Sequence, residues 1–559
     1  MSGLISNLAT SSKALGVHSK GLEIAGKNLA NINNRNYAKQ RVEIGDRGSI
    51  GTGIATESMG VEAMELRQNR DVLLDKSVMR ELTASSGLEA AKKILESAET
   101  ALGQFLDRTK DSTSIQNAGG ANGGGISDAL TDFFNAWESF SVKPNDVGEK
   151  QLLIAKAQIL AEKINATDKN LKQVQTDTDS QLTTDVGIVN GILAEIAKTN
   201  EYIAKAELVK PYSAVDLRDQ RQAKLEELSK YIDASFKPGD LGQITVESGG
   251  KTLIEGKVVT GQTINAATGQ LTGPFSYDAT AQKIKLESAD FTSGGKLAAQ
   301  LAASTGSVQT TRNQIKDLAI QLKQEVNNTY KANGGTQNFF DFSETSTGLL
   351  NLQFNSSMTL AAGSAGGNSR ALEVAELGTK IYPESTKVVL TSTGNHGLNN
   401  DETVTIGDDT TTSYKVEVLS NKSFMLRSDV SPATNPATYS YSVPSTLPLV
   451  IKRNGDTVAT AAITTGGLRN LNFKGSFSAN FNTTVTELAQ KLNTTNIRLE
   501  DQNLSQEMAV SNRDQFSGVS QDEELTDLMK FQRSFQATSR FINVVDNLLD
   551  QVVNRLGSF

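Results

Sequence analysis

Residues 4–32 read LISNLATSSKALGVHSKGLEIAGKNLANI, and apolar side chains recur along this stretch at alternating intervals of three and four residues. This alternation is the heptad pattern of a helix that presents one apolar stripe to a partner helix. The apolar positions of the stripe are Leu4, Leu8, Leu15, Leu22, Leu29 and Ile32. The pattern predicts a long amphipathic helix near the N-terminus.

The C-terminal residues repeat the same spacing. Their apolar positions are Leu528, Phe531, Phe535, Ile542, Val545, Leu549, Val552 and Leu556. A helix with a single apolar stripe is marginally stable alone in water, because nucleation is costly and packing supplies its stability. We therefore expect the two terminal helices to pair with each other or with neighbouring subunits. The two sets of residues are together called the assembly seam.

An asparagine cluster follows the N-terminal stripe, where residues 28–44 read NLANINNRNYAKQRVEI. Asparagine tolerates the left-handed backbone conformation and bonds its own backbone, so it ends helices and builds turns. The cluster predicts that the helix stops here and that the chain changes direction.

The composition favours a multidomain protein with long helices. The chain has 559 residues, which is two to four domains at roughly 150 residues each. It contains only 9 prolines, and proline is the residue that interrupts helices. The net charge of −8 argues against nucleic acid as a partner. A run of about 18 apolar residues is missing, so we expect no membrane partner, and the N-terminus lacks the pattern of a cleavable secretory signal.

The middle of the chain alternates between helical and strand patterns. Helical patterns cover residues 61–106, 130–140, 150–208, 215–232 and 296–331, whereas strand patterns cover 243–292 and 350–480. A glycine-rich break, AGGANGGGIS, occupies residues 118–127. The expected fold class is therefore multidomain α+β, with terminal coiled-coil helices that pair, a mostly helical rod-like domain and inserted outer β domains.

We expect four domains. Residues 1–45 and 515–559 form a terminal assembly domain, and residues 46–235, 296–345 and 480–514 form a helical rod domain. Residues 236–295 are an inserted β region, and residues 346–479 are a variable outer β domain with a small module near 386–445.

The residues offer no catalytic or metal site, so we expect no enzyme and no cofactor. With two histidines and no cysteine, the chain cannot build a histidine triad site, a three-histidine zinc site or a thiolate site. His18 lies on the seam, where a packed imidazole is expected and pH sensing is the alternative. His396 lies in a Gly/Asn loop and is expected to be structural. Trp137 lies on an amphipathic helix, where a core position is favoured over a carbohydrate platform, and a carboxylate pair of the glycosidase kind stays open.

The stretch NLANINNRNYAKQRV resembles the N-terminal signature of the bacterial flagellar rod, hook and hook-associated axial proteins. The matching residues are Asn28, Ala30, Asn31, Asn33, Tyr37 and Gln40. Asn34, Arg35 and Asn36 stand where the family usually has Thr-Pro-Gly. Asn36 is the non-glycine residue best able to take the positive φ that glycine would take, and whether these three residues keep the turn geometry of the family stays open.

Four further segments resemble the hook-associated members of this family. They are ISDALTDFFNAWESFSVKP (126–144), VDLRDQRQAKLEELS (215–229), GKTLIEG (250–256) and SGVSQDEELTDLMKFQRSFQATSRFINVVDNLLDQVVNRLG (517–557). Residues 386–445 resemble a small β module of large surface and phage-tail proteins.

The resemblance implies a structural role at the junction between the flagellar hook and filament. It also implies that the protein is required for assembly of the filament on the hook. It implies self-association of about eleven subunits, contacts with the hook protein and the second junction protein, an export chaperone, and secretion through the flagellar type III apparatus. The termini are expected to be disordered in the monomer and to order on assembly. The alternatives are another hook or rod protein, a secreted β-rich adhesin, and an enzyme domain within residues 350–480.

Overall fold

The structure is a computed structural model of the whole chain. It describes residues 2–46, 49–51, 56–58, 61–103, 125–208, 213–264, 271–291, 294–332, 335–345, 347–363, 368–383, 387–392, 395–406, 409–420, 422–428, 451–453, 456–457, 463 and 468–551. Most of the glycine-rich break at 118–127 lies outside these residues. The chain forms two compact units: residues 1–91, 179–301 and 496–559 make the first, and residues 92–178 and 302–495 make the second.

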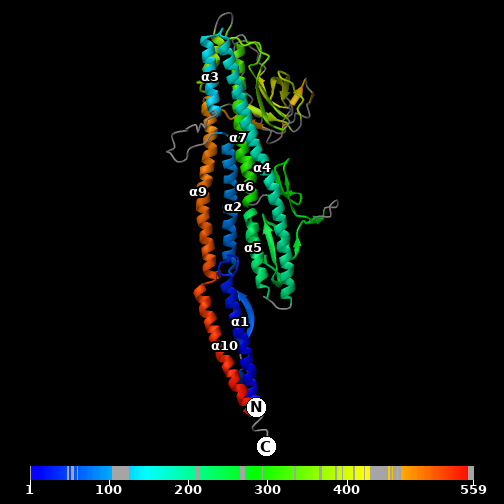
Figure 1. The fold of residues 1–559 in the computed structure, drawn as a ribbon. Helices are drawn as coiled ribbons and strands as arrows, with labels where there is room; N and C mark the ends of the chain where they lie inside the picture. The colour runs from blue at the N-terminus through cyan, green and yellow to red at the C-terminus, as the bar shows by residue number, and fades with distance from the viewer. Residues whose placement is uncertain are drawn as a thin grey trace. The chain divides into compact units, whose positions relative to one another are not determined.

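The terminal helices of the first unit lie side by side. Helix α1 (Ser2–Ala30) and helix α10 (Gln521–Asp550) pack along each other, as the blue and red ribbons of Figure 1 show. The stop predicted at the asparagine cluster is confirmed, because α1 ends at Ala30 and a turn follows.

A β-hairpin follows the turn, where the sequence pattern predicted helix from residue 61. Strand β1 (Gln40–Asp46) pairs antiparallel with β4 (Val61–Gln68), with Val42 opposite Leu66. A short second pair, β2 (Ser49–Gly51) and β3 (Thr56–Ser58), lies between them in the chain. The helical prediction for 61–68 was wrong, because pairing with β1 outweighs a helical pattern this short. The helix α2 begins only at Val72 and ends at Ala101.

The β region of the first unit packs on two helices. Helix α4 (Val147–Glu207) contributes its C-terminal half to this unit, and α5 (Val215–Tyr231) follows it. The strands are β5 (Ala234–Pro238), β6 (Ile244–Ser248), β7 (Lys251–Glu255) and β8 (Val258–Val259) in one antiparallel sheet, and β11 (Phe275–Asp278), β12 (Lys283–Leu286) and β13 (Ala289–Asp290) in another. A two-stranded sheet of β9 (Thr263–Ile264) and β10 (Leu271–Thr272) and the 3₁₀ turn η1 (Asp240–Gly242) complete this region.

One apolar core joins these helices and strands. Helix α4 presents an apolar stripe with helical spacing to this unit, and all of its members are buried: Leu182, Val186, Val189, Leu193, Ile196 and Ile203. Val246 and Ile254 from the sheet and Leu228 from α5 belong to the same core cluster. Helix α6 (Gly295–Ala302) covers part of it through Leu297.

The second unit is built around a buried tryptophan. Helix α3 (Ile126–Val142) carries Trp137, which is fully buried among the rings of Phe133, Phe140, Tyr330 and Phe339. The core interpretation of Trp137 is therefore confirmed, since a carbohydrate platform needs an exposed ring. The other elements here are η2 (Ala303–Val308), α7 (Gln309–Ala332), β14 (Phe340–Glu344), β15 (Leu350–Phe354) and α8 (Ser369–Glu376).

A seven-stranded antiparallel sheet belongs to the second unit, in the order β21-β20-β17-β18-β19-β16-β22. Its strands are β16 (Val388–Thr391), β17 (Thr403–Ile406), β18 (Asp409–Val418), β19 (Ser423–Ser428), β20 (Ile451–Arg453), β21 (Asp456–Thr457) and β22 (Leu468–Asn470). The chain then enters α9 (Phe477–Ser517), which contributes to both units. The protein is thus mostly helical, with several antiparallel sheets.

Candidate functional site

The predicted apolar stripe of α10 forms the more buried face of this helix. Leu528, Phe531, Phe535, Ile542 and Leu549 are partly buried and Val545 is buried, whereas most of the residues between them are exposed. Helix α10 approaches α1 closely at Phe531, whose ring lies on the backbone of Gly21. A Cβ atom at Gly21 would stand 2.6 Å from Cδ1 and Cε1 of that ring.

Helix α1 buries a face that is rotated slightly from its leucine column. Its buried residues are Val17, Gly21, Ile24, Ala25 and Asn28. The column itself, Leu8, Leu15, Leu22, Leu29 and Ile32, is only partly buried. The small Gly21 explains the rotation, because it lets the bulky Phe531 approach the helix axis. The side chain of Leu4, and Val552 and Leu556, lie outside the described residues.

Three motif residues meet in one buried hydrogen-bond network at the end of α1. Asn28 accepts the Tyr37 hydroxyl at 2.7 Å and the Gln40 backbone N–H at 3.1 Å through Oδ1. Its Nδ2 donates to the Gln40 carbonyl at 2.8 Å and to Glu524 Oε2 of α10 at 3.0 Å. All four residues are buried. The side chain of Asn28 therefore fixes both the returning chain and the start of α10, and we call these four residues the corner network.

The other motif asparagines shape the turn or face solvent. Asn31 donates from Nδ2 to the Lys27 carbonyl at 2.9 Å, and so closes the end of α1. Asn34 Oδ1 accepts the backbone N–H of Asn36 at 3.2 Å. Ala30 and Asn33 are exposed.

The open question about Asn36 has an answer: its φ is not positive. Among the described non-glycine residues, φ is positive at Leu241, Gln282, Glu287 and Asp401, and Asn36 is not one of them. The Asx-type bond from Asn34 and a backbone bond from the Tyr37 N–H to the Asn34 carbonyl at 3.0 Å make the turn without left-handed backbone at Asn36.

Ion pairs surround the corner network, and sequence patterns gave no signal for them. Lys39 pairs with Glu523 at 2.7 Å and with Glu524 at 3.1 Å. Arg513 of α9 pairs with Glu226 at 2.6 Å and donates to the Arg35 carbonyl at 3.2 Å. These contacts tie the turn to the joint between α9 and α10.

Arg70 is a second anchor of the turn. It pairs with Asp75 at 3.1 Å and Asp219 at 2.7 Å, and it donates to the Asn36 carbonyl at 3.1 Å. Burial raises the pKa of Asp219 to about 6, although the Arg70 guanidinium acts in the opposite direction. Burial likewise raises the pKa of Asp75 and of Tyr37 above their ordinary values.

The two histidines differ in their surroundings. The structural interpretation of His396 is confirmed, because its Nε2 contacts the Ser420 carbonyl at 2.7 Å and its Nδ1 accepts the Leu398 N–H at 2.9 Å. Burial lowers the pKa of His396. His18 is partly buried on α1, and its role stays a prediction. Over the described ranges, the acidic and histidine side chains form no metal-binding group of three or more, and no helix has the length and apolarity to span a membrane.

Comparisons with known proteins agree with the motif resemblance. Residues 112–340 match the profile of the "Flagellar hook-associated protein FlgK helical domain", and residues 511–556 match that of the "Flagellar basal body rod FlgEFG protein C-terminal". Flagellar hook-associated protein 1 of Bacillus subtilis is 23% identical over 579 residues, which cover 100% of this chain and 99% of the relative. The protein of the same name from Salmonella typhimurium is 23% identical, over 99% and 100% of the two chains.

A solved structure shows a similar chain. The flagellar hook junction protein FlgK from Burkholderia pseudomallei is 15% identical, with a TM-score of 0.38 over 85% of this chain and 99% of that one.

Proposed function

We propose that this chain is a member of the flagellar hook-associated protein 1 family and a structural subunit of the junction between the flagellar hook and filament. The relatives from Bacillus subtilis and Salmonella typhimurium match it over 99% and 100% of their length, and the profile matches include the C-terminal segment 511–556. It is an axial protein of the flagellum and not an enzyme. The match of residues 112–340 to the hook-associated helical domain disfavours the alternative of a hook or rod protein.

The observation that supports an assembly role is the apolar surface that the paired termini leave uncovered. Helix α10 carries a second apolar face beside its seam, made of Phe541, Val544 and Leu548, all of which are exposed. The leucine column of α1 is only partly buried. Continuous apolar surface on a soluble chain marks an interaction site. We assign these faces to contacts between neighbouring copies.

The partners follow from the family. We propose self-association into a ring of about eleven subunits through repeated identical contacts, with the hook protein and the second junction protein as neighbours. Export through the flagellar type III apparatus, with a chaperone, precedes assembly. In this proposal, residues 1–45 and 515–559 form the assembly domain, residues 46–235, 296–345 and 480–514 form the rod domain, and the β segments 236–295 and 346–479 are outer insertions.

Assembly should also change the order of the termini. Residues 1–45 and 515–559 should exchange amide hydrogens faster in the free monomer than in the polymer, because the seam is short of partners in the monomer. Strong protection of both segments in the monomer would contradict this part of the proposal.

Deletion of the gene in its host tests the junction role. Cells that lack the protein should build complete hooks and shed flagellin monomers, whereas normal filaments would overturn the proposal. Complementation of the deletion strain with variant genes then tests the exposed apolar face of α10. Val544→Ser should fail to restore filaments, and Val258→Ser is the matched control, since the two valines are 56% and 58% exposed and Val258 lies on β8.

A further inference from the structure

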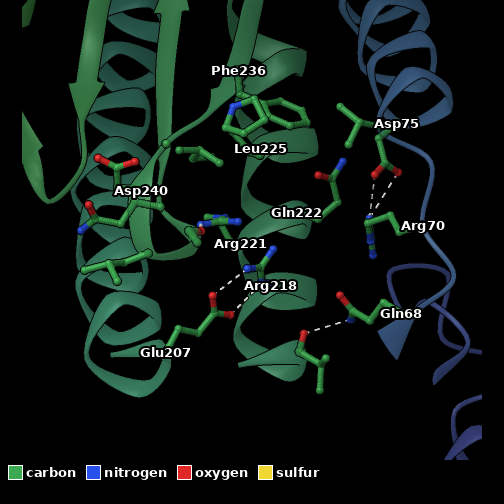
Figure 2. Close-up of a pocket in the computed structure, with 18 of the residues that line it drawn as sticks. Gln68, Arg70, Asp75, Glu207, Arg218, Arg221, Gln222, Leu225, Phe236 and Asp240 are labelled. Carbon is green, nitrogen blue, oxygen red and sulfur yellow. Dashed lines mark hydrogen bonds and ion pairs between the residues drawn. The ribbon is translucent and has the colours of Figure 1, made fainter. Parts of the chain in front are cut away.

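A cavity lies in the first unit, next to α5 and away from the assembly seam. Its volume is about 650 Å³, and one face of α5 lines it through Arg218, Arg221, Gln222 and Leu225. These residues follow one another at helical spacing, so they project to the same side of the helix. Figure 2 shows the two arginines side by side near the centre, with Leu225 and Phe236 along one wall.

Besides the exposed Arg67, which pairs with Glu43, two further arginines at this cavity have carboxylate partners. Arg218 donates from Nε and NH2 to the two carboxylate oxygens of Glu207, at 2.9 and 2.8 Å. Gly242 crosses directly over this pair with a φ of +70°, and a Cβ atom there would collide with Glu207 and Arg218. Arg70 pairs with Asp75 and Asp219 as described above. The charges of these two arginines are therefore balanced within the chain.

Arg221 is different, because its partners are neutral. It is 6% exposed, and its NH1 donates to Asn200 Oδ1 and to the Gly242 carbonyl, both at 2.8 Å. Among the described residues, no carboxylate lies within ion-pair distance of Arg221, and its Nε and NH2 have no hydrogen-bond partner while they keep access to water. Burial, followed by the Arg218 charge, lowers the pKa of Arg221 to about 10. A buried cation is costly unless an anion pairs with it.

The free donors of Arg221 define the chemistry of the missing partner. A guanidinium presents Nε and NH2 as a planar fork, which matches the two oxygens of a carboxylate. The apolar wall of Leu225 and Phe236 suits a ligand that carries an apolar body beside its charge. We propose that this cavity binds a small organic carboxylate, whose charge pairs with Arg221 and whose apolar part lies toward Leu225 and Phe236. Such a site goes beyond the structural role of the protein.

Isothermal titration of the full chain at low salt tests the site, with benzoate as the probe. Benzoate should bind, whereas uncharged benzamide and inorganic phosphate should bind at least about tenfold more weakly, since one lacks the charge and the other lacks the apolar body. No binding of benzoate would overturn the proposal. Equal binding of benzamide would overturn the pairing with Arg221, and equal binding of phosphate would overturn the apolar part.

Three variants locate the binding. Arg221→Gln should weaken benzoate binding at least about tenfold. Arg80→Gln is the control, because Arg80 is a 74% exposed arginine of the same unit that pairs with Glu81 and is not among the residues that line the cavity. Glu207→Gln should tighten binding by about threefold or more, because it removes the carboxylate that shares the cavity with Arg221. This gain cannot arise from misfolding, so unchanged or weaker binding by a folded Glu207→Gln chain would count against the site.

Discussion

Phe531 of α10 lies on the backbone of Gly21 in α1, so closely that no side chain fits between them. Gly21→Ala would place a methyl group 2.6 Å from two ring atoms. Overpacking of this kind costs about 1–3 kcal/mol, which exceeds the gain of about 1 kcal/mol from alanine in a helix. We expect Gly21→Ala to lower the free energy of unfolding of the assembled protein in urea and to reduce filament formation.

Two other glycines of α1 provide the control. Gly16 and Gly26 have open space where a Cβ atom would be. Gly16→Ala and Gly26→Ala should each stabilise the helix by about 1 kcal/mol. If all three substitutions stabilise the chain alike, the contact between Gly21 and Phe531 does not define the pairing of α1 with α10.

Asn28 is the residue on which the corner network depends. Asn28→Ala would leave the Tyr37 hydroxyl and the Gln40 backbone groups buried without their partners. Because each buried unsatisfied group costs about 1–3 kcal/mol, we expect a loss of about 3 kcal/mol in urea unfolding. Asn33 is exposed, so Asn33→Ala should lower the free energy of unfolding by less than about 0.5 kcal/mol. Equal losses for the two variants would contradict the network.

The turn after α1 gives a prediction about backbone conformation. Since Asn36 does not have a positive φ, Asn36→Val should leave motility nearly unchanged. Asn34→Ala should be the more harmful change, by about 0.5–1 kcal/mol in urea unfolding, because Asn34 Oδ1 accepts the Asn36 N–H. The reverse order of the two effects would show that position 36 requires left-handed backbone.

The buried Asp219 gives a prediction about pH. Its pKa is about 6 in the folded chain, above the ordinary aspartate value near 3.9, so the native state binds the proton more tightly than the unfolded state. The stabilisation from this proton is complete below about pH 4 and is lost as the pH rises through about 6. The free energy of unfolding should therefore fall over this range by up to about 3 kcal/mol, and Asp219→Asn should remove that part of the slope.

An exposed carboxylate in the same unit serves as the control for Asp219. Asp527 is 42% exposed and pairs with Lys530 on the surface of α10. Asp527→Asn should leave the slope of the pH profile between pH 4 and 6 as it is in the wild type. A wild-type slope that persists in Asp219→Asn would assign the effect to other groups, such as the buried Asp75.

The periodicity of apolar residues predicted the features that a single helix determines by itself. The stripe of α4 and the burial of Trp137 follow from spacing alone, because a helix core face repeats every three to four residues. Spacing could not show which side of α1 would be buried. That choice depends on the absence of a side chain at Gly21 and on the bulk of Phe531, which are more than 500 positions apart in the chain.

The sequence predicted few of the hydrogen bonds and ion pairs. The asparagine motif located the corner, but its charged surroundings come from Arg70, Asp219, Arg513 and Glu524, which no local pattern connects. The same holds for Arg221, whose missing counter-ion is visible only when α5 and the β region are folded together. Strand β4 was mistaken for helix for a related reason, since its partner β1 decides its conformation.

The bond between Asn28 and Glu524 joins residues that are 496 positions apart. Closing so long a loop requires that nearly the whole chain be present, although the entropic cost grows only slowly with its length. A chain that stops before residue 524, through premature termination or proteolysis, cannot complete the corner, whatever the state of its other parts. The corner network is therefore complete only in a subunit whose chain extends through residue 524.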